Sequence, residues 1–144
     1  MTTPHASRPA TTDPWTWIFL LSALGNLANG LWMLADPAGW YTLLPAGVPD
    51  FGPLNEHFVR DIGATFTMFG LGLLWATFRP TVRLPVLVLL ALFNGLHALV
   101  HVYDTGRGLV GPEHWGIDFP AVYLPTIGLL ILTAALVRHS KRHA

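Results

Sequence analysis

The sequence predicts an all-α integral membrane protein, an antiparallel four-helix bundle with both termini in the cytoplasm. Three observations predict this fold class. Only 11% of the 144 residues are charged and 52% are apolar, whereas about 25% charged residues are usual in a soluble domain. Four apolar runs are each long enough to cross a bilayer as a helix, which takes roughly 20 residues. Lysine and arginine are concentrated in alternate connecting segments.

The four apolar runs define one transmembrane domain, residues 15–137, between two tails. The first run is too long for the core of a signal peptide, so we expect it to be an uncleaved span. Polar residues, proline and threonine dominate residues 1–14, which we expect to form a disordered cytoplasmic tail. Residues 138–144 are expected to form a basic cytoplasmic tail. The expected spans cover residues 15–35, 58–78, 84–103 and 119–137.

Local signals indicate where several helices begin. Asp36 can cap, and Pro37 can start, a short helix in the first outer loop. Asn55 and Asp118 are typical N-cap residues, which predicts that they cap the second and the fourth span. The connection 79–83 is so short that the second and third spans are expected to be antiparallel neighbours.

The charges orient the bundle. With the N-terminus inside, six of the eight lysines and arginines lie on the cytoplasmic side, and only Arg60 and Arg107 lie at or beyond the outer face. Such an excess of positive charge over short loops is typical of the cytoplasmic side. The sequence therefore predicts a multi-pass protein with N-in, C-in topology.

Composition also excludes several classes of function. The chain has no cysteine, so disulfide scaffolds and thiolate chemistry are excluded. The formal net charge of zero gives no footprint for nucleic acid. The lipid bilayer is the expected partner. Ala91 and Gly95 are small residues four positions apart, which could let helices approach closely. The sequence leaves open whether the protein forms a homo-oligomer or joins a larger membrane complex.

Polar residues recur at helical spacing within the apolar runs. Asn94, His97, His101 and Asp104 are spaced 3, 4 and 3, which places them on one face of the third span. Polar groups inside a membrane are costly, so they are candidates for function. All the candidates fall in the outer half of the bundle, where we expect one shared pocket. The others are Asn26, Asn29, His57, Arg60, Asp61 and Tyr123.

Three kinds of chemistry fit this set. Two histidines at i, i+4 with a carboxylate suit zinc or non-haem iron. In a metal site His97, His101 and Asp104 would be ligands, with His57 and Asp61 opposite them, and Asn26, Asn29, Asn94, Arg60 and Tyr123 would orient or line the site. The same pocket could instead hold a small amphipathic ligand, with or without catalysis, or handle protons. In the alternative, a non-enzymatic accessory or assembly protein, the polar residues would only fix helix packing.

Two stretches carry a family resemblance, NEHFVRDIG at 55–63 and LHALVH at 96–101. They resemble segments of the small four-helix bacterial inner-membrane proteins called DoxX-like. The resemblance implies a four-helix bundle located in the bacterial inner membrane. Most members have no assigned activity and some are linked to quinone-coupled oxidation, so no catalytic residue is carried over from it.

Overall fold

The computed structural model describes residues 13–143, and every regular element in that range is helical. Four helices are long and apolar enough to cross a membrane, which confirms the prediction of an all-helical fold with four helices of membrane-spanning length. The elements are α1 (Pro14–Ala35), α2 (Pro37–Leu43), η2 (Val48–Phe51), α3 (Glu56–Phe78), η3 (Pro80–Val82), α4 (Arg83–Gly106), α5 (His114–Asp118), η4 (Phe119–Tyr123) and α6 (Leu124–His143).

The ends of the helices follow local chemistry in most places. The Asp36 carboxylate accepts a hydrogen bond from the Gly39 amide at the start of α2, and the Asn55 side chain accepts one from the Phe58 amide in α3. Both predicted caps are therefore confirmed. Asp13 caps α1 by accepting from the Trp15 amide, so the helix begins within the expected tail. The rest of that tail, residues 1–12, lies outside the described residues, and α6 continues the last span through the basic segment.

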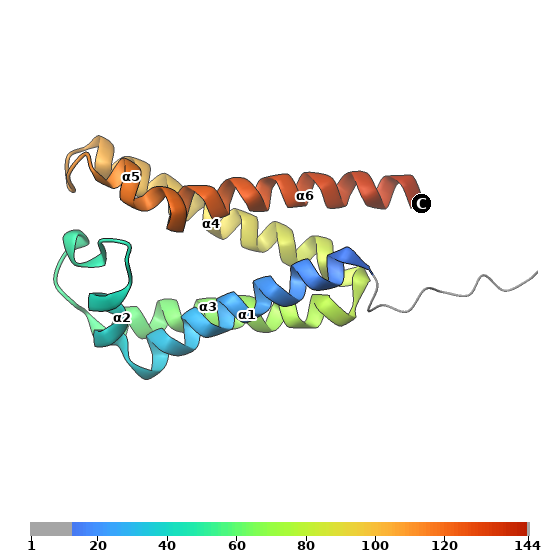
Figure 1. The fold of residues 1–144 in the computed structure, drawn as a ribbon, viewed down its shortest axis with the longest axis horizontal. Coiled ribbons are helices and arrows are strands. Elements are labelled where there is room, and N and C mark those ends of the chain that lie inside the picture. The colour runs from blue at the N-terminus through green and yellow to red at the C-terminus, as the bar shows by residue number, and fades with distance from the viewer. Residues whose placement is uncertain (1–12, 144) are drawn as a thin grey trace, which may run out of the picture.

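The four long helices are arranged as two pairs (Figure 1). The α1 helix packs mainly along α3, and α4 packs mainly along α6, while α3 and α4 share fewer contacts. We call the end that carries α2, η2 and α5 the loop end, and the end that carries the α3–α4 connection, residues 79–83, the turn end. Most packing therefore occurs within the pairs. The fewer contacts between the two pairs fix how one pair lies against the other at the loop end.

Glycines let α1 and α3 approach closely. A Cβ atom added to Gly30 would lie 2.6 Å from the Thr67 backbone nitrogen and 2.7 Å from the Gly63 carbonyl oxygen. One added to Gly70 would lie 2.6 Å from the Leu27 side chain. The predicted close approach at Gly95 is wrong: no atom outside its own helix lies within 4 Å of its Cβ position. Gly95 instead lines an open apolar groove of about 420 Å³ between α4 and α6.

We expect Gly30→Ala to destabilise the α1–α3 pair by about 1 to 3 kcal/mol, the usual cost of overpacking. Two of the three nearest atoms, the Thr67 nitrogen and the Gly63 oxygen, are backbone atoms, which cannot rotate aside. Thermal unfolding in detergent measures the effect. Gly25→Ala is the matched control on the same helix, because no atom lies near its added methyl group. Equal melting temperatures for the two variants would contradict the close contact.

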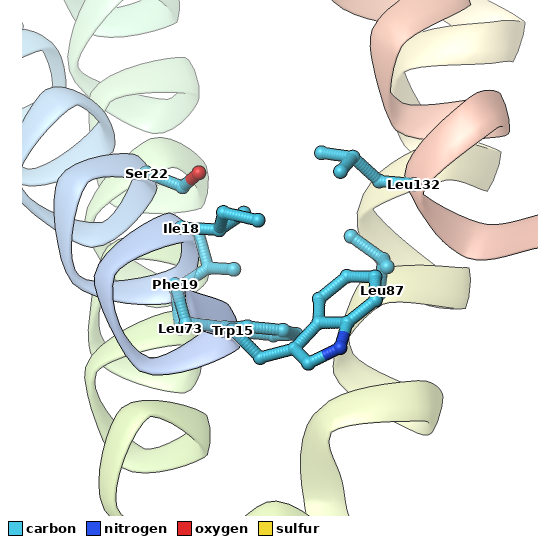
Figure 2. A pocket seen from close by; sticks show the side chains of 7 residues that line it. All are labelled: Trp15, Ile18, Phe19, Ser22, Leu73, Leu87 and Leu132. Carbon is cyan, nitrogen blue, oxygen red and sulfur yellow. The ribbon is translucent and has the colours of Figure 1, made fainter. Parts of the chain in front are cut away.

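The apolar core lies where all four long helices meet toward the turn end. Phe19 and Leu73 are 1% exposed, and Leu87 and Leu136 bring α4 and α6 to the same cluster. Figure 2 shows Trp15, Ile18 and Ser22 of α1 on one side, and Leu87 of α4 and Leu132 of α6 on the other. The space between them is too small for a water molecule. The space that these residues leave toward the turn end therefore offers no room for a ligand.

Arg83 is buried at the turn end, with only 4% of its surface exposed. Its guanidinium forms an ion pair with Asp13 and donates to the Thr16 hydroxyl at 2.9 Å. It also donates to the carbonyl oxygens of Ala76 and Thr77, in the last turn of α3. Arg83, whose charge predicted only the orientation of the bundle, thus joins the first turn of α1 to the end of α3.

Candidate functional site

His97 and His101 lie side by side on α4, as their spacing predicted. Their ring centroids are 4.6 Å apart at an interplanar angle of 76°. On its other side the His97 ring stacks on Phe93, which packs against Phe66 and Phe69 of α3. The two histidines therefore continue an aromatic cluster that lies between the helix pairs.

Asp118 is the centre of the polar network at the loop end. Its carboxylate is 1% exposed, with Oδ2 2.8 Å from His101 Nδ1 and Oδ1 3.2 Å from His114 Nδ1. The prediction that Asp118 caps the fourth span is wrong, because this side chain makes no capping hydrogen bond. Both carboxylate oxygens instead lie at hydrogen-bond distance from an imidazole Nδ1 atom, so the two histidines satisfy the buried carboxylate.

His114 extends the network to the segment between α2 and α3. The ring is fully buried, and its Nε2 atom lies 3.1 Å from Asp50 Oδ2 in η2. Phe51, the next residue of η2, packs edge-on against both His101 and His114, with centroid distances of 4.9 and 4.8 Å. The segment around η2 thus contacts α4 and α5 through one ion pair and one aromatic ring.

Two buried hydroxyl groups near this network have no hydrogen-bond partner among the described residues: Thr105 Oγ1 and Tyr123 Oη. Tyr123 was predicted to line the site, and its ring stacks on Trp115 with centroids 6.3 Å apart. Thr105 follows His101 by one helical turn. Buried polar atoms without partners are rare in folded proteins, and both of these atoms lie at the loop end.

The residues predicted to face the histidines from α3 are exposed and pair along their own helix. The His57 and Asp61 side chains are 88% and 63% exposed, with Nε2 and Oδ2 3.6 Å apart. Arg60 donates to Glu56 at 2.9 Å. Asp104 on α4 makes no side-chain hydrogen bond or ion pair with any described residue, the two histidines included. The exposed His57–Asp61 and Arg60–Glu56 pairs each contribute about 1 kcal/mol or less to the free energy of unfolding.

The three asparagines do not orient the histidines. Asn26 and Asn94 donate to the carbonyl oxygens of Ser22 and Leu90, one turn earlier in their own helices. Asn29 accepts from the Trp40 indole at 2.9 Å and so fixes α2 against α1. These amides satisfy backbone groups or join neighbouring helices, as in the packing interpretation of the polar residues.

The predicted metal site is not assembled in the described chain. Within residues 13–143 no group of three or more histidine, aspartate or glutamate side chains is placed to hold a metal ion. Of the five predicted ligands, His97 and His101 are together, whereas His57 and Asp61 form a separate exposed pair and Asp104 joins neither. Periodicity placed the histidines correctly but could not place α3 relative to them.

Two members of the network, Asp50 and His114, were not predicted from the sequence, and Asp118 was predicted only as a helix cap. His114 and Asp118 are four residues apart, the same spacing that singled out His57 and Asp61, so that signal was present. Asp50 is 64 positions from His114, and no local pattern connects them. Comparison with known proteins adds no assignment, because no family model, curated protein or solved structure matches the chain.

Proposed function

We propose that this protein takes a small amphipathic molecule from the bilayer and binds its polar group at His97 and His101. The proposed setting is the bacterial inner membrane, with N-in, C-in topology, so that the loop end faces outward. The unequal distribution of lysine and arginine supports that orientation. Membership of the DoxX-like group stays a prediction.

One observation carries the proposal: the His97 imidazole has no hydrogen-bond partner among the described residues. His97 lies nine residues before the end of α4, which is roughly 14 Å along the helix. At that depth neither water nor lipid headgroups satisfy a polar group readily, and an unpaired one costs free energy. A ligand with a polar group at this height would remove that cost.

The chemistry of His101 specifies what kind of polar group fits. Asp118 binds the Nδ1 atom of His101 at 2.8 Å, and an ionised carboxylate only accepts hydrogen bonds. Nδ1 therefore carries the proton of this hydrogen bond, and in a neutral imidazole with that tautomer Nε2 is an acceptor. A ligand hydroxyl or amide N–H can donate to Nε2.

The aromatic side chains beside His97 fit the apolar part of such a molecule. Phe93 stacks on the His97 ring at a centroid distance of 6.1 Å, and Phe66 and Phe69 extend the cluster onto α3. An apolar chain or ring bound there would contact both helix pairs while its polar group reached the histidines. The ligand class is therefore a small lipid-soluble molecule with a hydrogen-bond donor.

A second candidate function is that of a non-enzymatic accessory or assembly protein. One observation favours it: both oxygens of Asp118 and both ring nitrogens of His114 have hydrogen-bond partners within the protein, so these groups need no ligand. In this case the polar residues would only hold the outer segments together, and His97 would have no ligand.

The two candidates predict different results for His97→Phe. Phenylalanine keeps the stacking on Phe93 and removes the hydrogen-bonding group. Small molecules extracted from the purified full-length protein are measured by mass spectrometry. We expect a lipid-soluble species that is enriched with the wild type and falls about tenfold or more in the variant, because a lost hydrogen bond of about 1.4 kcal/mol has that effect.

His57→Phe is the matched control, since His57 is exposed and pairs only with Asp61 among the described residues. It should retain the bound species at the wild-type level. Absence of any enriched species, together with a lower melting temperature for His97→Phe alone, would contradict ligand binding and favour the packing function.

A further inference from the structure

The His114 ring contacts two carboxylates at once. Its Nδ1 atom is 3.2 Å from Asp118 Oδ1, and its Nε2 atom is 3.1 Å from Asp50 Oδ2. Ionised carboxylates only accept hydrogen bonds, and a neutral imidazole has a single N–H to donate. The two hydrogen bonds therefore need one proton more than a neutral histidine between two ionised carboxylates holds.

The neighbouring groups place that extra proton on His114. Asp118 also faces the Nδ1 atom of His101 on α4 through its second oxygen, so each of its two oxygens accepts a hydrogen bond from an imidazole. Asp50 of η2 is the other charged group facing the ring, and the Tyr123 phenol of η4 lies in the electrostatic field of Asp118. An imidazolium between two carboxylates compensates charge in a site where an unpaired charge would be costly.

The hydrogen bond from protonated His114 to Asp50 joins the two helix pairs. Asp50 and Phe51 lie between α2 and α3, whereas His101 and His114 lie on α4 and α5. The backbone at Gly47, with φ +61°, also abuts the ring, because a Cβ atom there would lie 2.8 Å from His114 Cε1. The His114 imidazole thus contacts two carboxylates, the Phe51 ring and the Gly47 backbone.

We propose that His114 is a proton-binding site whose proton holds the η2 segment closed over the end of α4. When the proton leaves, the remaining N–H stays with the buried Asp118. The Nε2 lone pair then faces the ionised Asp50, which is 58% exposed and can turn to water. The closed form therefore dominates at acid pH and is lost at alkaline pH. This inference is independent of the ligand proposed above.

The sequence has no cysteine, so two introduced cysteines can be spin-labelled specifically and the distance between the labels measured. Leu54→Cys and Leu109→Cys place two spin labels at exposed positions on either side of the contact. Distances are measured in the full-length protein in lipid nanodiscs from about pH 5 to about pH 9, which brackets the usual titration range of histidine. We expect one distance at acid pH and an added longer population at alkaline pH.

Two further substitutions in this labelled background distinguish the mechanism. Asp50→Asn should stay closed throughout, because its amide can donate to the neutral ring. Glu113→Gln is the matched control: Glu113 is an exposed acid beside His114 and should leave the pH dependence unchanged. Nitrogen-15 spectra of labelled histidine should show both ring nitrogens of His114 protonated in the closed form. Wild-type distances that do not change with pH, an Asp50→Asn protein that opens at alkaline pH, or a closed form with one protonated ring nitrogen would each overturn the proposal.

Discussion

Arg83→Met should lower the free energy of unfolding by about 3 kcal/mol, because hydrogen bonds to a charged group contribute about 1.5 to 3 kcal/mol and the buried guanidinium makes several of them. The variant removes the Asp13 ion pair and the hydrogen bonds to Thr16 and to the last carbonyl oxygens of α3. Methionine keeps most of the side-chain volume that packs near the Phe19 ring, so the loss reports the polar contacts. Thermal or denaturant unfolding in detergent measures it.

Arg79→Met is the matched control for Arg83→Met. Arg79 is exposed in the same connection, and its replacement removes the same positive charge from the same side of the membrane. Its effect should stay within about 0.5 kcal/mol, as for most surface substitutions. If both variants lost the same free energy of unfolding, the buried polar contacts of Arg83 would not stabilise the fold.

Asp118→Asn should be the next most damaging change, lowering the free energy of unfolding by about 2 to 3 kcal/mol. Two imidazole N–H groups point at this carboxylate, and an asparagine side chain offers only one oxygen. One histidine would then face an amide N–H instead of an acceptor. Because Asp118 is fully buried, water cannot replace the lost acceptor.

The measurement for Asp118→Asn is denaturant unfolding combined with hydrogen exchange of the α5 amides, which should become faster. Asp104→Asn is the matched control: Asp104 is a half-buried aspartate on α4 that lacks a side-chain partner in the described part of the chain. It should unfold like the wild type. Slow exchange of α5 in Asp118→Asn would show that the network does not hold the loop end.

Local features of the fold were predictable because they depend on a few consecutive residues. The caps at Asp36 and Asn55 need only a side-chain oxygen and an amide two or three positions later. The adjacency of His97 and His101 follows from 3.6 residues per turn. The cap prediction for Asp118 failed for the opposite reason, since its actual donors include a histidine on another helix.

The sequence by itself determined that the chain forms four apolar helices of membrane-spanning length and that two histidines share a face of the third. Only the tertiary structure decided that α1 pairs with α3 through Gly30, that Arg83 is buried, and that Asp50 meets His114. Periodicity fixes where a side chain lies around its own helix axis. The rotation of that helix against its neighbours depends on contacts between residues far apart in the sequence, such as the glycine approach between α1 and α3. The polar network depends on the same long-range contacts, so its members could not be assembled from spacing alone.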